Sequence, residues 1–334
     1  MANEIENLLM EYEQIRRDNR GNLDNKKMEL FKKVPRLEEI EDEINKLSIN
    51  KTKSLLINNS DEDIAKINKR LAELKEEMHG LLEKEGLDES YLKLKYNCEK
   101  CLDTGFVKYD NKKSEMCSCL KQRLINISYN KSNLSNLKRE NFKEFDLNKF
   151  SDKVDLEKYK MNISPRQNIE NIKKASTSFV ENFDNTDTKN LFFTGNTGLG
   201  KTYMTNCIAN EVLKKGKTVL YQTAPVLLET IIDNKFNKYK TSNTYDFYNH
   251  VLDVDLLIID DLGTEVPNSM KISELFTILN ARALNLNNKL TRTIISSNLS
   301  IEQIFNVYEE RIGSRIAGFY DIYYFFGEDL RLKK

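Results

Sequence analysis

The eight residues GNTGLGKT, from Gly195 to Thr202, constrain the fold of this 334-residue chain more than any other segment. They match the pattern G-x-x-x-x-G-K-[ST] and stand between a short apolar run, Asn190–Thr194, and a helix-forming stretch, Thr202–Lys214. Glycines let the backbone curl so that its N–H groups face a phosphate, and the positive end of the following helix adds to the attraction. The segment therefore predicts a nucleotide-binding loop made of Gly195, Asn196, Thr197, Gly198, Leu199, Gly200, Lys201, Thr202 and Tyr203.

Strand and helix patterns alternate on both sides of this loop. Further strands are expected at 218–224, 256–259 and 293–298, and a helix is expected over about 270–285. Strands that alternate with helices predict a parallel sheet covered by helices on both faces, which places this part of the chain in the α/β class. The closing residues DIYYFFGEDLR fit either a last strand or the edge of a lid.

Polar residues at the ends of these strands point to the chemistry of a nucleotide. Lys201 is expected to reach the β- and γ-phosphate oxygens, and Thr202 and Asp260 are expected to hold Mg²⁺. Asp261 is the candidate for polarising an attacking water, and Asn298 is placed to orient that water. Arginines near the C-terminus either stabilise charge in the transition state or pair with surface glutamates; they are Arg311, Arg315 and Arg331.

Four of the five cysteines fall in one short stretch, as Cys98-x-x-Cys101 followed by Cys117-x-Cys119. Four thiolates can close a tetrahedral site, so the pattern predicts a structural zinc ion. The alternative is a set of unliganded or redox-active thiols, although no thioredoxin-like pattern surrounds the CxxC pair. The fifth, Cys207, is expected to be a small buried hydrophobic residue.

The region before the cysteines is charged and favours helices. A short helix is expected over Glu4–Arg17, and apolar stripes predict two more, one over 34–47 and one from Ser60 to Leu81. A break near Asn58-Asn59, and a capping box formed by Ser60 and Asp63, suggest that the last two fold back as a hairpin. The stripes either pack within the chain or serve in part as a docking face for a partner.

Composition excludes several classes of function. Lysine plus arginine and aspartate plus glutamate both number 52, which argues against a monomer that adheres to nucleic acid by charge alone. Only two histidines occur, so a histidine-based triad or a multi-histidine metal site is nearly excluded. No apolar run approaches the roughly 20 residues of a membrane helix, and the acidic start is unlike a secretory signal. We therefore expect a soluble, cytoplasmic protein with no membrane partner.

The order of these features resembles bacterial replicative-helicase loaders of the DnaC/DnaI type. The resemblance rests on the cysteine cluster with its CSCLKQ run, on FKEFDL, SPRQNI and GNTGLGKT, and on IIDDLG and the GEDLR tail. It implies an AAA+ P-loop domain in which Asn298 is the sensor-1 residue and Arg331 is the sensor-2 arginine. It also implies an arginine finger acting on ATP in the next subunit. Arg315 matches that finger, and Arg311 is a close competitor.

The resemblance further implies a division of labour along the chain. Residues 1–130 would form a mostly helical, zinc-binding domain that binds the hexameric replicative helicase; residues 131–164 would be a linker. Residues 165–334 would be the AAA+ ATPase domain, which self-associates when ATP-bound and contacts single-stranded DNA. The implied function is ATP-dependent delivery of the helicase onto that DNA during replication initiation or restart, with ATP, Mg²⁺ and Zn²⁺ as cofactors.

Two alternatives stay open at this point. The chain could be an ATP-gated DNA-binding scaffold that hydrolyses little ATP, or an IstB-type transposition ATPase, which shares the same core. The four cysteines favour the loader, and the acidic pair favours some hydrolysis. AAA+ proteins usually carry Glu at the position of Asp261, so we expect slow hydrolysis that serves as a timing switch.

Overall fold

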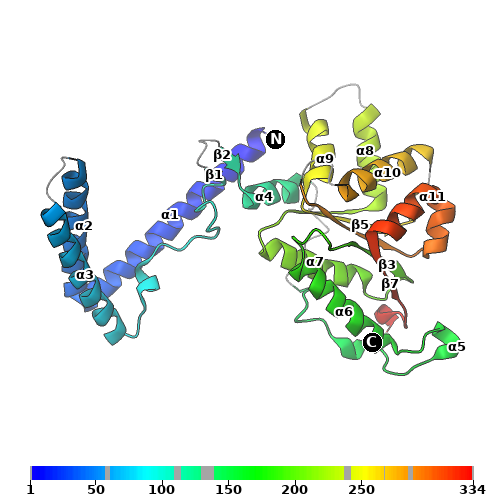
Figure 1. Ribbon diagram of the computed structural model, residues 1–334, viewed down its shortest axis with the longest axis horizontal. Coiled ribbons are helices and arrows are strands. Elements are labelled where there is room, and N and C mark those ends of the chain that lie inside the picture. The colour runs from blue at the N-terminus through cyan, green and yellow to red at the C-terminus, as the bar shows by residue number, and fades with distance from the viewer. Residues whose placement is uncertain are drawn as a thin grey trace. The chain divides into compact units, whose positions relative to one another are not determined.

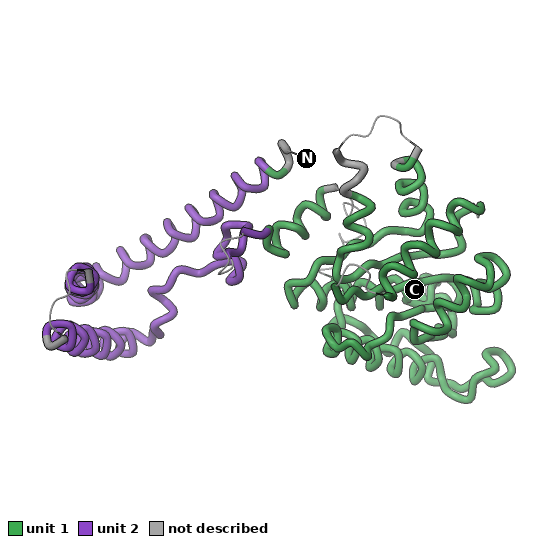
Figure 2. Tube along the Cα trace, turned by 45° about the horizontal axis from the view of Figure 1, so that its top comes forward, with its two compact units in different colours: residues 1–5, 116–334 green, residues 6–115 purple. Residues whose placement is uncertain are grey.

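A computed structural model describes residues 2–56, 61–108, 114–128, 139–236, 242–266, 268–284 and 289–332. The chain divides into two compact units, one of residues 6–115 and the other of residues 1–5 and 116–334 (Figure 2). No helix in the described ranges is long and apolar enough to cross a membrane.

Three long helices dominate the unit of residues 6–115: α1 (Ala2–Lys33), α2 (Pro35–Leu56) and α3 (Asp61–Lys84) (Figure 1). Helices α2 and α3 lie side by side as the expected hairpin, and Arg36 pairs with Glu77 across it at 2.8 Å. Leu30, Leu37 and Leu82 form a buried cluster that packs the end of α1 on the hairpin. The expected break and the Ser60 cap lie outside the described residues.

Helix α1 corrects one prediction, because the short helix expected over 4–17 extends to Lys33. Its middle is rich in charged residues that favour helices, and a single glycine, Gly21, lowers helix stability by only about 1 kcal/mol. Burial of Leu30 at its far end supplies the packing that keeps the added turns folded. After α3 come a short helix, η1 (Glu89–Leu92), and two short paired strands, β1 (Phe106–Lys108) and β2 (Ser114–Met116).

A five-stranded parallel sheet is the centre of the larger unit, and it confirms the predicted α/β class. Its strands stand in the order β4-β5-β6-β3-β7, so that β3 lies between β6 and β7. The predicted strands appear at nearly the expected positions, and the first part of the tail forms the last strand. The strands are β3 (Asn190–Gly195), β4 (Val219–Thr223), β5 (Leu256–Leu262), β6 (Arg292–Ser297) and β7 (Tyr320–Phe325).

Helices cover both faces of this sheet (Figure 1). Neighbouring strand residues point to opposite faces, so Phe192 joins one buried core and Phe193 the other. The core around Phe193 is covered by α6 (Pro165–Glu181) and α7 (Lys201–Lys214). The core around Phe192 is covered by α8 (Ala224–Phe236), α9 (Ser242–Asp253), α10 (Ser269–Ala283) and α11 (Ile301–Phe319).

Side chains from two helices bond to the outer strands of the sheet. Gln122, on α4 (Ser118–Ser128), accepts the Val219 N–H at 2.6 Å and donates to the Val219 carbonyl at 3.0 Å. Asn168, on α6, donates to the Tyr324 carbonyl at 2.8 Å. Helix α4 thus packs in the same unit as the sheet, whereas the sequence groups residues 1–130 together. The boundary of the helicase-binding domain stays a prediction.

Candidate nucleotide-binding site and cysteine cluster

The phosphate loop begins where β3 ends, and its first glycine is required by a close contact. A Cβ atom at Gly195, where φ is +139°, would lie 2.1 Å from the Phe325 carbonyl oxygen on the neighbouring strand. Only glycine fits such an approach at such a backbone angle. The loop then leads directly into α7, which begins at Lys201. The N-terminus of α7 therefore meets the loop, as the motif predicts.

Lys201 lies inside the loop, with only 6% of its surface exposed. Its Nζ donates to the carbonyls of Gly195 at 2.6 Å and Asn196 at 2.7 Å, and to Oδ1 of Asn298 at 2.8 Å. Burial lowers the pKa of Lys201 to about 8, although the charges of Asp261 and Asp260 partly oppose that shift. Two residues predicted from separate motifs, Lys201 and Asn298, are thus in direct contact.

This lowered pKa predicts a pH dependence for phosphate binding. The ammonium form binds phosphate, and in the free protein that form is lost as pH rises through about 8. The affinity for a nucleoside triphosphate should change little below about pH 7, fall by about half at pH 8, and then fall by about tenfold per pH unit. Titrations at several pH values would measure it. A Lys201→Arg variant stays charged and should show no such fall; a flat profile for the unchanged protein would contradict the prediction.

Asp260, at the end of β5, is 4% exposed and is held by three hydroxyl groups. Its Oδ2 accepts from Thr202 at 3.2 Å and from the Tyr221 hydroxyl, and its Oδ1 accepts from Ser296. Burial and the Asp260 charge raise the pKa of Tyr221, which keeps this hydroxyl a donor. Thr202 and Asp260 present adjacent hard oxygen donors, which is the donor set that Mg²⁺ prefers.

Asp261 adopts an unusual backbone conformation, with φ of +55°. The register between β5 and β6 shifts between Ile259 and Leu262, and the Asp261 N–H donates to Ser296 Oγ at 3.1 Å. Such a bulge redirects a side chain at the end of a strand. Burial and the neighbouring Asp260 carboxylate raise the pKa of Asp261, while Lys201 and Arg331 oppose the rise.

Most of the predicted nucleotide residues line one cavity of about 660 Å³. The predicted residues that line it are Thr197, Gly198, Leu199, Gly200, Lys201, Thr202, Tyr203, Asp261, Asn298 and Arg331. Gly195 and Asn196 contact Lys201, and Asp260 contacts Thr202, so these three adjoin it. The structure therefore gathers these residues, and their roles stay predictions.

Residues 140–150 supply a second wall of this cavity, to which no sequence pattern assigns a role. Phe145 packs edge-on against Tyr203 at 5.2 Å between ring centroids, and the Phe150 ring lies 6.0 Å from that of Phe145. Acidic and polar side chains alternate with these rings, among them Glu144 and Asn148. The FKEFDL run was the one sequence signal here, and it carried no spacing that points to a ligand.

The other two arginines lie elsewhere. Arg311 and Arg315 lie on α11 and do not line the cavity. Their guanidinium groups stand over the Phe276 ring of α10, at 5.1 and 5.9 Å from its centroid. Arg311 also pairs with Glu309 at 2.9 Å. Because both guanidinium groups lie over the same ring, these contacts do not separate Arg311 from Arg315, and both stay candidates for an arginine finger.

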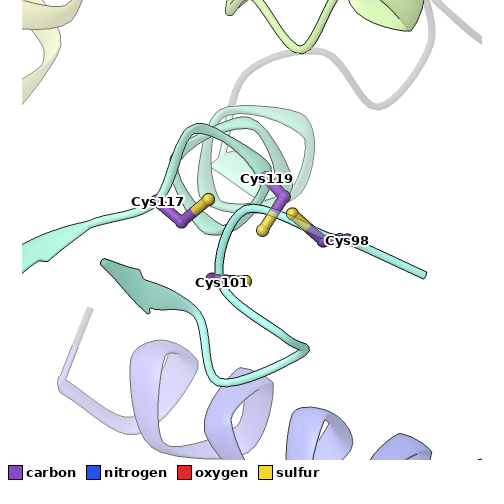
Figure 3. Close-up of side chains that lie close together, drawn as sticks. All are labelled: Cys98, Cys101, Cys117 and Cys119. Carbon is purple, nitrogen blue, oxygen red and sulfur yellow. The ribbon is translucent and has the colours of Figure 1, made fainter. Parts of the chain in front are cut away.

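The four clustered cysteines converge in space, as Figure 3 shows. The sulfur atoms of Cys98, Cys101, Cys117 and Cys119 all lie within 4.8 Å of one another. Zn–S bonds of about 2.3 Å in a tetrahedron place sulfur atoms about 3.8 Å apart, so the donor set and its spacing fit zinc. Cys207 is fully buried in α7, and burial raises the pKa of its thiol to about 12. That agrees with an inert packing residue.

Asp103 is a structural residue of the cysteine turn that the cysteine spacing does not predict. Its carboxylate is 1% exposed and accepts the backbone N–H groups of Asn97 at 2.9 Å and Cys98 at 2.8 Å. Thr104 adds a hydroxyl bond to the Cys101 carbonyl at 2.6 Å. These bonds fix the direction of the CxxC turn. An aspartate two residues after the second cysteine, followed by Thr and Gly, was the available signal.

Comparison with known proteins identifies one matching family and several similar proteins. Residues 106–313 match the sequence model of the IstB-like ATP binding proteins. The chain is 26% identical to the replicative helicase loader DnaC of Escherichia coli K12 over 148 residues, 44% of this chain and 57% of DnaC. It is 30% identical over 138 residues to the replication initiator DnaA of Buchnera aphidicola from Cinara cedri, which covers 41% of this chain and 30% of DnaA. A crystal structure of the DnaC helicase loader matches with 22% identity and a TM-score of 0.42 over 52% of this chain and 96% of that one.

Proposed function

Because this chain belongs to the family of IstB-like ATP-binding proteins, we propose that it is an ATPase that loads a replicative helicase onto single-stranded DNA. The observation that carries the proposal is its similarity to proteins named replicative helicase loaders, of which it matches 57% of the Escherichia coli protein's length. The cavity lined by Lys201, Asp261 and Arg331 supports a nucleotide-dependent action.

The residues of this cavity have different roles toward bound ATP. Backbone N–H groups of the loop and the Lys201 ammonium hold the phosphates. Thr202 and Asp260 would hold Mg²⁺, which neutralises charge that develops on the phosphate oxygens. Asp261 accepts a hydrogen bond from the attacking water, and Asn298, already bonded to Lys201, orients that water. Hydrolysis is slow because Asp261 is one methylene shorter than the usual glutamate.

Completion of the site requires a second copy of the chain. Arg311 and Arg315 do not line the cavity of their own chain, so a role on ATP has to be exercised on a neighbouring copy. Arg331, which lines the cavity, acts within its own chain. ATP would therefore order the assembly, and DNA would be bound only by that assembly, since the charges of one chain balance at 52 against 52.

An affinity experiment tests the helicase part of the proposal. The full chain and two truncated forms, one starting at residue 131 and one at residue 116, are mixed with the replicative helicase of the same cell. We expect the full chain to retain the helicase and both truncated forms to lose it. The longer form keeps α4, whose Gln122 bonds to the sheet, and should still bind ATP.

ATP binding is measured with the same truncated forms, so that loss of helicase binding can be told apart from damage to the fold. Loss of the helicase together with ATP binding would indicate damage to the fold rather than loss of a docking domain. Retention of the helicase by the form that starts at residue 131 would contradict the assigned docking role of residues 1–130. Retention of a transposase in place of the helicase would favour the transposition ATPase, the alternative with the same core.

A further inference from the structure

The described residues that follow β7 pack on the phosphate loop. We call Gly327–Leu332, which follow β7, the C-terminal segment. The Leu330 N–H donates to the carbonyl of Gly198 at 3.0 Å, and Leu330 and Arg331 line the cavity. Strand β7 also aligns Phe325 with Gly195, at the start of the loop. The loop and the C-terminal segment are therefore in contact at two places.

Asp329 is at the centre of this contact. Its Oδ1 accepts the backbone N–H of Arg331 at 2.9 Å and so bends the chain into a short helix, η3 (Leu330–Leu332). The same carboxylate lies against Gly198, where an added Cβ would stand 1.8 Å from Oδ1. Gly198 also has φ of +76°, which other residues rarely adopt. The contact between Asp329 and the loop thus depends on a glycine at this position.

The rest of the C-terminal segment is attached to its surroundings. Glu328 pairs with Lys158 at 3.7 Å, and a Cβ at Gly327 would lie 3.3 Å from Pro165, the first residue of α6. Arg331 itself is exposed at the rim of the cavity, so its direction depends on the backbone that precedes it. The Arg331 charge opposes the rise in the pKa of Asp261 and adds to the lowering for Lys201. Its field therefore reaches the phosphate end of the cavity.

We propose that Asp329 is a positioning residue that holds Arg331 at the cavity and couples its placement to the conformation of the phosphate loop through Gly198. The proposal rests on ATP binding in this cavity and on the role of Arg331 there. A phosphate-filled loop holds the Gly198 carbonyl in place for Leu330, and Arg331 is thereby directed toward the nucleotide. Replacing Asp329, or changing the loop at Gly198, releases Arg331 from this position.

Four variants of the full chain test this role: Asp329→Ala, Asp329→Asn, Arg331→Ala and the double alanine variant. Affinities for ATP and ADP are measured with each. Asp329→Ala should weaken ATP binding about as much as Arg331→Ala, and the double variant should be no weaker than either. Asp329→Asn should bind nearly as well as the unchanged protein, because the amide Oδ1 still accepts the Arg331 N–H. Asp321→Ala, at an exposed aspartate on β7, is the matched control.

Hydrogen exchange supplies a readout that is independent of nucleotide affinity. The Leu330 amide should be protected in the unchanged protein and in Asp329→Asn, and it should exchange faster in Asp329→Ala and in Gly198→Ala. ATP binding by Asp329→Ala at the unchanged level would overturn the proposal, as would full additivity with Arg331→Ala. The proposal would also be overturned if Asp329→Asn bound ATP as weakly as Asp329→Ala. If the helicase is not bound while these effects appear, the loader proposal fails and the positioning role stands.

Discussion

An Asp261→Asn variant is expected to hydrolyse ATP at least about 100-fold more slowly than the unchanged protein while binding ATP with similar affinity. The amide has the shape of the carboxylate but cannot accept a proton from water. The backbone should tolerate the change, because asparagine adopts the left-handed conformation seen here, with φ of +55°, at least as readily as aspartate. Steady-state hydrolysis and equilibrium binding of ATP measure the two effects separately.

Two further variants make this result specific. Asp260→Asn should weaken ATP binding as well as hydrolysis, because the Asp260 carboxylate accepts hydrogen bonds from three hydroxyl groups, one of them that of Thr202. Asp321→Asn, at an exposed residue that does not line the cavity, should change neither. Hydrolysis by Asp261→Asn within a few fold of the unchanged protein would show that another group activates the water. If the Asp261→Asn variant still loads the helicase as well as the unchanged protein, the result would favour the ATP-gated scaffold over a loader that needs hydrolysis.

Removal of the cysteine pair Cys98 and Cys101 is expected to have the second large effect. The freshly purified protein should contain one zinc ion per chain, and a Cys98→Ser, Cys101→Ser variant should contain none. Structural zinc sites contribute apparent binding energies of about 10–16 kcal/mol to folding, so the turn around Asp103 should lose its protection from hydrogen exchange. Elemental analysis and exchange over residues 97–104 measure the two consequences.

Cys207→Ala is the matched control for zinc, because it removes a cysteine that lies buried in α7 outside the cluster. It should keep the full zinc content. ATP affinity should be nearly unchanged in the serine variant, since the ATP cavity includes none of the four clustered cysteines. Absence of zinc from the unchanged protein would refute the site, and zinc retained by the serine variant would show that other ligands hold it.

The features that sequence predicted well are those carried by short, local patterns. The spacing of the motif predicts the loop from Gly195 to Thr202, and the composition of the apolar runs predicts the strands of the sheet. Asn298 was expected beside the nucleotide because it ends a strand of the sheet, and the structure bonds it to Lys201 of the loop. The convergence of the four cysteines followed in the same way from their spacing.

What sequence did not predict depends on the path of the chain between elements. Residues 140–150 reach the nucleotide cavity only because the chain runs past Tyr203 before α6 begins. Arg282 is another case. In sequence it is one more charged helix residue, yet it is 2% exposed and donates to the carbonyls of Val251, at 2.8 Å, and of Arg292. Such roles arise from backbone groups far away in sequence, which no local pattern reveals.

The hydrogen bonds that Gln122 and Asn168 make to the outer strands bear on how copies of this protein can associate. Exposed strand edges invite another chain to pair with them, which leads to irreversible aggregation. At Val219 both backbone groups are already bonded, so an incoming strand would first have to displace the Gln122 amide. The proposed association of copies would therefore use helix and loop surfaces rather than this strand edge. Such contacts would let the proposed assembly separate when the nucleotide changes.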